Sequence, residues 1–244
     1  MVKQERAART RQSLIRAAAE VFAQEGFAPA SLATISRRAG VSNGALHFHF
    51  ENKKALARAV EDEAAETVAR ITKGVLEGGG SALQMLVDTT HELMNRLADD
   101  IVVRAGFELG GDLARGEEPQ LRREWQRWIE EMLRRADQEG GLADGVSPDG
   151  AACAIVAATV GFEVLGGENR EWLTEEKIAG FWDLVLPGLA GRCGLLPVTS
   201  SGAEGPARRL VGGSAGGRSG SPAGSPVGRS GDDGGVAVPA AATD

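Results

Sequence analysis

Residues 31–50 read SLATISRRAGVSNGALHFHF, and this stretch decides the fold. Ser31 and Ser42 each precede a short run with apolar residues at helical spacing, and serine is a preferred residue at helix N-termini. Between the two runs stands Gly40, which can adopt the positive φ of a tight turn. Two short helices joined in this way form a helix-turn-helix, whose second helix can enter the major groove of DNA. Short capped helices with a glycine turn also occur in other helical proteins, so the spacing alone leaves that alternative open.

The second of these helices is predicted to present small and polar residues outward. Asn43 can read a base edge, Gly44 lets the backbone approach closely, and Ala45 can touch a thymine methyl group. Serine hydroxyls at helix starts, imidazoles and a lysine suit phosphate oxygens, and a basic N-terminal arm that includes Arg11 can reach the adjacent backbone or minor groove. The candidate DNA-binding residues are Ser31, Ser42, Asn43, Gly44, Ala45, His47, His49, Lys53, Arg6 and Arg9.

Charge is distributed unevenly along the chain. The whole chain has a formal net charge of -7, but residues 1–60 hold ten Lys/Arg and four Asp/Glu, which gives +6. Residues 61–244 hold 17 basic and 30 acidic residues, which gives -13. A basic head on an acidic body places a polyanion-binding site in the head and repels DNA elsewhere.

Helical periodicity recurs along the chain and no segment alternates with a period of two, so we expect an all-α fold. The N-terminal domain, 1–52, is a three-helix helix-turn-helix (homeodomain-like) unit, and 53–198 form a C-terminal helical ligand-binding and dimerisation domain. Residues 199–244 are rich in Gly, Ser, Pro and Ala and are predicted to be a disordered tail. Gly166 and Gly167 are predicted to break the penultimate helix, and Pro187 to kink or end the last one early. The expected helices cover residues 6–25, 31–40, 42–50, 53–77, 81–99, 101–109, 118–139, 149–165 and 174–190.

Several classes of protein are disfavoured by composition. The longest apolar stretch, 151–162, has 12 residues, which is fewer than the ~20 needed to span a bilayer. Cys153 and Cys193 are too few and too widely separated for a disulfide framework or a zinc site. His47 and His49 are two residues apart and point to different sides of a helix, so they do not form a metal pair. We therefore expect a cytoplasmic protein with no membrane contact, no metal and no cofactor, and with no nucleophile–base pair of an enzyme.

The apolar patterns of the C-terminal half suggest a dimer interface and a ligand site. Residues 174–190 are apolar nearly all round, so this helix must be buried on two sides. A two-fold homodimer with a four-helix interface provides the second side, and an ordinary internal helix is the alternative. Trp125, Trp128 and Met132 recur at helical spacing, a stripe that is more often core than ligand site.

The stretch from Gly40 to Leu56 resembles the DNA-binding domain of the tetracycline-repressor (TetR) family. The shared pattern is Gly-Val-Ser, Gly, Leu-Tyr-x-His-Phe, then Lys and Leu, and the match covers residues 10–60. The resemblance implies a regulator that binds a palindromic operator as a homodimer and holds a small ligand between C-terminal helices. Where the family has a Tyr that contacts phosphate, this chain has His47. An imidazole donates more strongly when protonated, so the contact is expected to depend on pH.

Three further runs resemble the γ-butyrolactone receptors, a TetR subgroup that governs antibiotic production. They are VVRAGFELG (102–110), EWQRW (124–128) and TVGFEVLGG (159–167). The resemblance implies that Trp125 contacts a lactone and that Thr159 hydrogen-bonds it. Members often carry Gln about where this chain has Ala64, which suggests a different ligand. The candidate ligand-binding residues are Trp125, Thr159, Trp128, Met132, Phe162 and Phe107.

The expected function is a transcriptional repressor that is released from its operator by a small apolar ligand, γ-butyrolactone-like, to control antibiotic production. Two alternatives stay open. One is a pseudo-receptor that responds to antibiotics, and the other is a DNA-binding regulator without a small ligand. In either case the protein acts in the bacterial cytoplasm, associated with the nucleoid through its operator.

Overall fold

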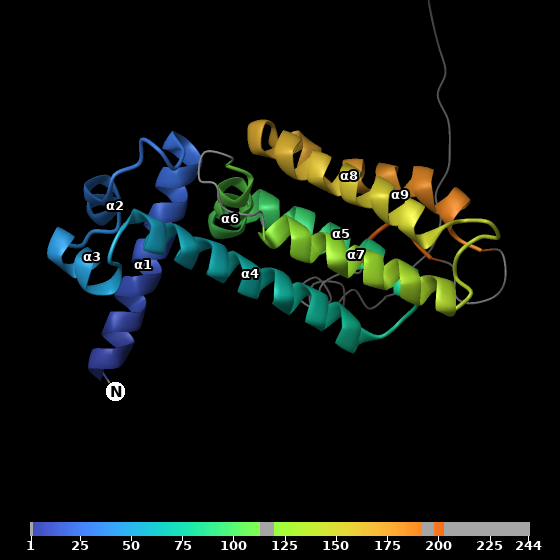
Figure 1. Cartoon of the computed structure of the whole chain (residues 1–244), viewed down its shortest axis with the longest axis horizontal. Coiled ribbons are helices and arrows are strands. Elements are labelled where there is room, and N and C mark those ends of the chain that lie inside the picture. The colour runs from blue at the N-terminus through green and yellow to red at the C-terminus, as the bar shows by residue number, and fades with distance from the viewer. Residues whose placement is uncertain (1, 113–119, 192–197, 203–244) are drawn as a thin grey trace, which may run out of the picture. The chain divides into compact units, whose positions relative to one another are not determined.

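The computed structural model describes residues 2–112, 120–191 and 198–202, most of which are helical (Figure 1). The described residues contain an isolated bridge between Leu142 and Ala190 and no longer strand, so the all-α prediction is confirmed. A 3₁₀ helix, η2, precedes the last α-helix. In chain order the elements are α1 (Val2–Glu25), α2 (Leu32–Arg38), α3 (Asn43–His49), α4 (Lys53–Gly78), α5 (Ala82–Asp99), α6 (Ile101–Gly111), α7 (Gln120–Gln138), α8 (Pro148–Glu168), η2 (Arg170–Leu173) and α9 (Glu175–Leu189).

The starts of α2, α3 and α4 are fixed by side-chain caps, two of which, at Ser31 and Ser42, were predicted above. The hydroxyl of Ser31 accepts a hydrogen bond from the Thr34 amide at 3.1 Å, and that of Ser42 accepts one from Ala45 at 3.1 Å. Asn52 caps α4 in the same manner. Gly40 in the turn between α2 and α3 has a φ of +69°. These local bonds satisfy amides that a helix leaves free at its first turn.

Two hydrophobic cores lie along the chain. The N-terminal core is formed by α1 to α4 together with one side of α6, and it includes Leu14, Ile15, Phe22, Ile35, Leu46, Leu56, Val60, Val102, Ala105 and Leu109. The C-terminal core is formed by α4 to α9 and includes Ala64, Val68, Leu86, Met94, Val103, Phe107, Trp125, Met132, Ile155 and Trp182. Because α4 and α6 contribute to both cores, they are the elements through which one core can act on the other.

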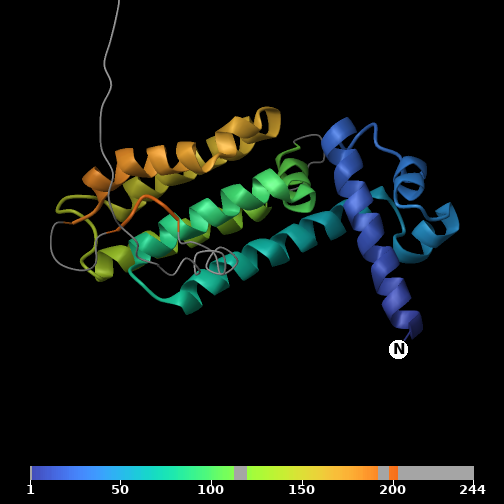
Figure 2. The same ribbon diagram turned by 180° about the vertical axis from the view of Figure 1, so that it is seen from behind.

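The crossing of α4 and α6 is unusually tight at Gly106. A Cβ atom placed on Gly106 would lie 2.5 Å from the Cβ of Ala64 and 3.3 Å from Cδ1 of Leu121. Ala64 is fully buried. The Ala64 position, discussed above for the resemblance to the receptors, is therefore filled by a close contact between two small residues, with α6 in the space that a longer side chain would need. Figure 2 shows α4 passing α6 on its way from the helix-turn-helix to α5.

Several helix ends differ from those predicted. α8 continues through Gly166 and Gly167 to Glu168. A Cβ on Gly166 would lie 2.5 Å from Cγ of Leu173, so this glycine makes room for η2 rather than ending the helix. α9 ends at Leu189, one residue before the predicted end at 190, so Pro187 does not end this helix early. α1 begins at Val2, four residues before the predicted start at residue 6, so the basic N-terminal residues Arg6, Arg9 and Arg11 lie within this helix. Residues 118–119, the predicted start of α7, lie outside the described residues.

Residues 198–202 lie against α5, although the sequence assigns most of them to the tail. The Thr199 amide donates to Oε1 of Gln84 at 2.8 Å, and Nε2 of His91 lies 2.8 Å from the carbonyl oxygen of Ser200. The rest of the predicted tail, 203–244, lies outside the described residues, as does Cys193.

One helix in the described part of the chain, α8, has the length and composition of a membrane span. Its mean hydropathy is 1.6, and only 28% of the apolar window is buried. The helix has 21 residues and extends beyond both ends of the unbroken apolar stretch 151–162, which alone is too short to span a bilayer. α8 packs on α7 and η2, and it leaves much of an apolar surface uncovered by its own chain.

Candidate nucleic-acid interface and ligand site

α3 is held to the rest of the helix-turn-helix by one side only. Leu46 is fully buried against Ile35 and its neighbours in the N-terminal core. The backbone N–H of Val41 donates to the Ser36 carbonyl at 3.0 Å, which closes the turn before α3. The opposite side of α3 is exposed, so two short helices locked in this way leave the second one free to dock elsewhere.

The exposed side of α3 carries the residues that the sequence predicted. Asn43, Gly44 and His47 are exposed, while Ala45 and His49 are half-buried. A Cβ placed on Gly44 would meet nothing nearer than the Ser42 hydroxyl at 3.9 Å. Gly44 is helical and has no positive φ, so packing within the chain does not require a glycine here. The missing side chain instead leaves the backbone open to close approach from outside.

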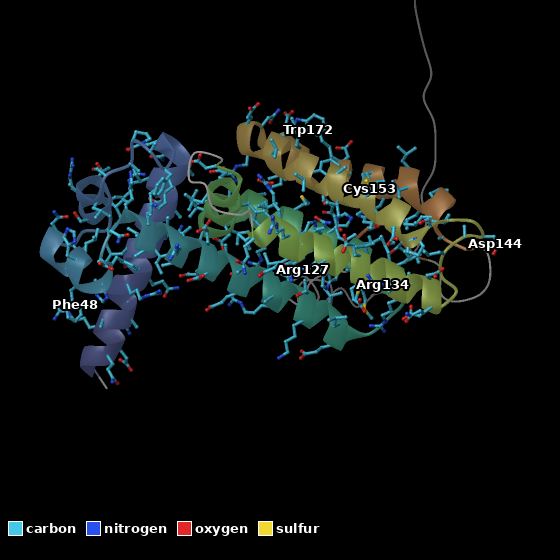
Figure 3. All side chains as sticks on the ribbon, in the orientation of Figure 1. Phe48, Arg127, Arg134, Asp144, Cys153 and Trp172 are labelled. Atoms are coloured by element: carbon cyan, nitrogen blue, oxygen red, sulfur yellow. The ribbon has the colours of Figure 1, made fainter. Side chains whose placement is uncertain are left out.

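Phe48 is a residue of this surface that the sequence analysis missed. Its side chain is 80% exposed, and it stands at the outer edge of α3 (Figure 3). The family pattern treats this position as variable, which concealed it. The available signal was its place in the helix, because a residue two positions after the buried Leu46 points away from the core.

Lys53 does not lie free on the DNA-facing surface, where the sequence placed it. Its Nζ donates to the carbonyl oxygens of Phe27, Ala28 and Ala30 at 2.8, 2.8 and 2.9 Å. The same ammonium lies 4.7 Å from the centre of the Phe27 ring. An ammonium has three N–H donors, and here all three are used to close the loop between α1 and α2.

The basic residues of α1 flank α3. Arg6 and Arg9 are exposed on the first turns of α1. The guanidinium of Arg11 lies 5.4 Å from the centre of the Phe50 ring, at the end of α3. Ser31 and Ser42 use their hydroxyls as caps but remain exposed. Cationic side chains beside an outward helix are suited to contact phosphates on either side of a groove.

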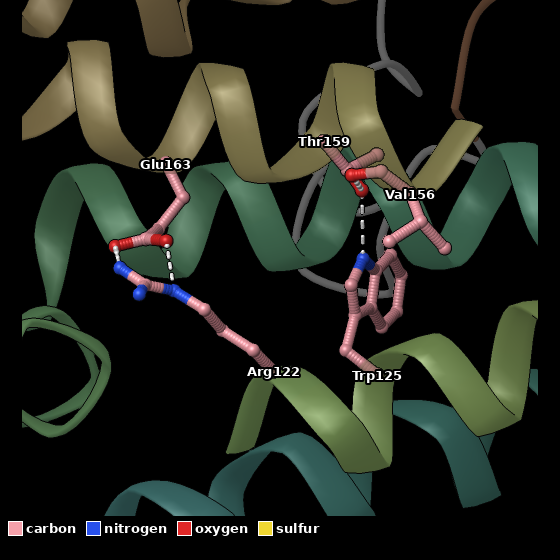
Figure 4. A network of polar contacts seen from close by, with 5 residues as sticks. All are labelled: Arg122, Trp125, Val156, Thr159 and Glu163. Atoms are coloured by element: carbon pink, nitrogen blue, oxygen red, sulfur yellow. Dashed lines mark hydrogen bonds and ion pairs between the residues drawn. The ribbon is translucent and has the colours of Figure 1, made fainter. Parts of the chain in front are cut away.

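The predicted ligand anchors meet between α7 and α8. Nε1 of Trp125 donates to the hydroxyl of Thr159 at 2.9 Å, and both residues are buried (Figure 4). Thr159 in turn donates to the Val156 carbonyl at 3.2 Å. Trp128 stacks on Trp125, with ring centres 5.3 Å apart and planes 12° from parallel. A ligand that used these two groups would have to replace the bond between them.

The other candidates divide between two sides of α8. Met132 and Phe107 belong to the C-terminal core with Trp125. Phe162 makes its ring contacts with Trp172 and Phe181, at 6.4 and 5.7 Å between centres, on the side that faces η2 and α9. The structure therefore does not bring Phe162 into the same ring cluster as Trp125.

Two buried indole N–H groups lack a hydrogen-bond partner within the described residues. They are Nε1 of Trp128 and Nε1 of Trp182, and the side chain of Trp182 is fully buried. Burying a donor without a partner costs about 1–3 kcal/mol. Groups of this kind in an apolar surrounding favour a guest that carries hydrogen-bond acceptors.

Charged groups join α6, α7 and α8 next to these aromatic residues. Nε and Nη2 of Arg122 donate to the Glu163 carboxylate at 2.8 and 3.0 Å, and Glu163 is buried (Figure 4). A Cβ on Gly111 would lie 2.5 Å from Nη1 of Arg122, so the end of α6 lies directly against this ion pair. Burial raises the pKa of Glu108 on α6, and nearby Arg104 partly opposes the increase. Burial also lowers the pKa of Arg104.

In the described part of the chain, no three His, Cys, Asp or Glu side chains are grouped so that they could hold a metal ion. The site is thus built from an outward helix with basic neighbours and from an aromatic core with a few polar groups. Together with the fold, this defines a helix-turn-helix regulator whose C-terminal helices share α4 and α6 with the N-terminal core.

Comparison with known proteins identifies the family. Residues 14–60 match the family model for bacterial regulatory proteins of the tetR family. The chain is 34% identical over 196 residues to the A-factor receptor protein of Streptomyces griseus, covering 78% of this chain and 67% of that protein. The chain belongs to the TetR family of DNA-binding transcription regulators and is similar to its γ-butyrolactone receptors. It is accordingly a regulator rather than an enzyme.

Solved structures show the same architecture. A γ-butyrolactone receptor superposes with a TM-score of 0.66 at 28% identity, covering 76% of this chain and 90% of the receptor. The TetR family protein CprB of Streptomyces coelicolor, in complex with its operator sequence, superposes with a TM-score of 0.64 at 29% identity. That match covers 75% of this chain and 90% of CprB. The predicted fold class and family are confirmed by these matches.

Proposed function

We propose that the chain represses transcription as a homodimer on a palindromic operator, and that a small apolar ligand of the γ-butyrolactone type releases it. The genes that it controls belong to antibiotic production, in keeping with the receptors it resembles. The protein acts in the cytoplasm, at its operators on the nucleoid.

The uncovered faces of α8 and α9 support the homodimer. Val164 and Leu165 on α8 are 50% and 39% exposed, and Leu184 on α9 is 81% exposed. The two helices run side by side in both views of the molecule (Figures 1 and 2). Adjacent apolar surfaces of this kind mark interaction sites, and two copies can cover them by forming a four-helix interface.

The hydrogen bond from Trp125 to Thr159 is the observation that carries the ligand proposal. It places an indole N–H and a threonine hydroxyl in the C-terminal core, where the hydroxyl accepts from the indole and donates to the Val156 carbonyl. The unpaired N–H groups of Trp128 and Trp182 add donors without acceptors. A lactone offers an apolar chain together with ester oxygens that only accept hydrogen bonds. This chemistry complements a core that has more donors than acceptors.

The packing of α6 provides a route from this core to α3. Leu121 and Arg122 on α7 lie directly over Gly106 and Gly111 of α6. The opposite side of α6 belongs to the N-terminal core and packs on α1. A ligand that moves α7 favours a different position of α6 and changes the separation of the two α3 helices in the dimer. Release then requires that the ligand bind the released state more tightly than the DNA-binding state, by only a few kcal/mol.

The test uses full-length protein, operator DNA and a series of synthetic γ-butyrolactones with alkyl chains of increasing length. We expect one of them to dissociate the complex and to raise the melting temperature of the free protein. Trp125→Phe keeps the ring but removes the N–H donor, and it should lose most of both effects while still binding operator. Trp172→Phe, at the exposed Trp of η2, is the matched control and should respond as wild type does.

The remaining outcomes separate the alternatives. Release by antibiotics and not by lactones would identify a pseudo-receptor. If neither group stabilises the protein or dissociates the complex, the ligand proposal is wrong and a ligand-independent regulator is left. An unchanged lactone response in Trp125→Phe would remove Trp125 from the ligand site.

A further inference from the structure

Phe48 is an exposed aromatic side chain on α3, the helix proposed to enter the major groove. Single exposed apolar side chains are common on protein surfaces and by themselves assign no function. Phe48, however, lies on the same short helix as Asn43 and Gly44, and 80% of its side chain is accessible. Among the described residues of the helix-turn-helix, it is the one large apolar side chain that is exposed, and Figure 3 shows where it lies on α3.

The helix geometry pairs Phe48 with Gly44. Residues four apart lie above one another on the same side of a helix, and both of these lie opposite the buried Leu46. Because Gly44 has no side chain, the backbone of α3 is accessible at that turn, and one turn further along the same side projects the aromatic ring of Phe48. The Phe48 ring meets the His49 imidazole edge-on, with centres 5.2 Å apart and planes at 87°, which restricts the ring's orientation.

We propose that Phe48 reads the C5-methyl group of a thymine in each half of the operator. The inference rests on the proposed operator binding and names a residue that sets its sequence preference. The thymine methyl is the apolar group that base pairs present in the major groove, and phenylalanine is among the side chains that contact it. The backbone at Gly44 can approach the DNA closely, which brings a ring one turn further along the same side within reach of the bases. The net charge of +6 on residues 1–60 favours DNA over an apolar protein partner.

The test removes the methyl group and the ring separately. The operator is first selected with full-length protein from random duplexes. Each thymine of the half-site is then replaced by deoxyuridine, which differs only in lacking the methyl group. Affinities are measured for wild type, Phe48→Ala and Phe48→Leu, with Leu76→Ala at the far end of α4 as an exposed apolar control.

We expect one thymine position of the half-site to differ from the others in its response to deoxyuridine. There, deoxyuridine should weaken wild-type binding about fourfold per half-site, the value of one buried methyl group. Phe48→Ala should bind the thymine operator more weakly and lose its sensitivity at that position alone. Phe48→Leu retains an apolar contact and should keep part of the sensitivity, and Leu76→Ala should behave as wild type.

The proposal is overturned if, at each thymine position, deoxyuridine weakens the binding of Phe48→Ala as much as it weakens the binding of wild type. It is also overturned if Phe48→Ala binds the operator as tightly as wild type, or if the selected half-site contains no thymine. A wild-type protein that binds no duplex would contradict operator binding itself. That outcome is distinct from tight binding without a methyl effect.

Discussion

Gly44 and Lys53 show how the role of a residue depends on what surrounds it. Gly44 has free space around the position of a Cβ atom, so folding does not account for a glycine. Lys53 has an exposed neighbour, Lys54, but its own ammonium is engaged by three carbonyl oxygens. We therefore propose that the first residue serves an external partner and that the second stabilises the helix-turn-helix.

Gly44→Ala should separate folding from DNA binding. Alanine in an exposed helix is more stable than glycine by roughly 0.5–1 kcal/mol, so the variant should melt at a higher temperature. Its added methyl group holds α3 away from the bases, and losing one base contact costs about 1–3 kcal/mol. Calorimetry and operator binding measure the two effects. If Gly44→Ala is more stable than wild type and binds the operator with the same affinity, Gly44 does not belong to the DNA interface.

Lys53→Ala should destabilise the protein without changing how binding depends on salt. Three charge-assisted hydrogen bonds and a cation–π contact disappear, which should cost about 2 kcal/mol or more. If Lys53 contacted a phosphate instead, the slope of log affinity against log salt would fall by about one. Lys54→Ala is the matched control for charge. Unchanged stability together with a shallower slope would restore the phosphate assignment.

The single residues that could be predicted are those whose partners lie close in sequence. The caps Ser31, Ser42 and Asn52 each accept a hydrogen bond from an amide three residues ahead. A glycine in a turn can be predicted from its residue type alone. The partners of Lys53 are carbonyl oxygens 23 to 26 residues away. Nothing in the local pattern distinguishes that contact from a phosphate contact.

Among the secondary-structure elements, α4 and α6 connect the two halves of the molecule. Each contributes side chains to both cores, and they approach one another at Gly106 and Ala64 without room for another carbon. Packed contacts of this kind transmit displacement because interiors are dense and do not deform continuously. The structure therefore gives Ala64 a packing role in this chain.

Gly106→Ala should destabilise the protein by about 1–3 kcal/mol, because the added methyl overlaps Ala64. Ala64→Gly removes the opposing carbon and should relieve part of that cost in the double variant. The free energies of unfolding of the two single variants and the double variant give the coupling directly. Additive effects would mean that the two residues do not meet, and that α4 and α6 are further apart than described.

The helices themselves were largely predictable, while some of their ends were not. Apolar residues at a spacing of 3.6 placed all nine α-helices of the described residues. Gly166 was read as a helix breaker because glycine lowers helix stability. In the structure it admits Leu173 of η2, a contact made only once the chain has turned back on itself. Pro187 was expected to kink the last helix or to end it early, and α9 continues past it for two residues.

At the scale of the whole molecule, the proposed function requires a dimer of two copies of the chain. α8 has the hydropathy of a membrane span but is only 28% buried by its own chain, and Leu184 of α9 is 81% exposed. The sequence suggested a dimer helix from an apolar pattern alone. It could not distinguish the face that packs inside the chain from the face left for a partner, because that division is set by tertiary contacts.

Leu184→Glu should convert the protein to a monomer, because two carboxylates would be buried in the proposed interface. Sedimentation velocity measures the mass, and operator affinity should fall by a factor on the order of 100, since one recognition helix supplies half of the specific contacts. Leu76→Glu is the matched control and should remain dimeric. A Leu184→Glu protein that stays dimeric would place the interface elsewhere.

Two copies of α3, held outward by the turn at Gly40, are proposed to read DNA together. The decisive experiment selects binding sites from a pool of random duplexes with the full-length protein. We expect enrichment of a palindrome whose half-sites lie about one helical turn, or a multiple of it, apart on the duplex. Recovery of no preferred sequence at low salt, or of a single unpaired half-site, would contradict it.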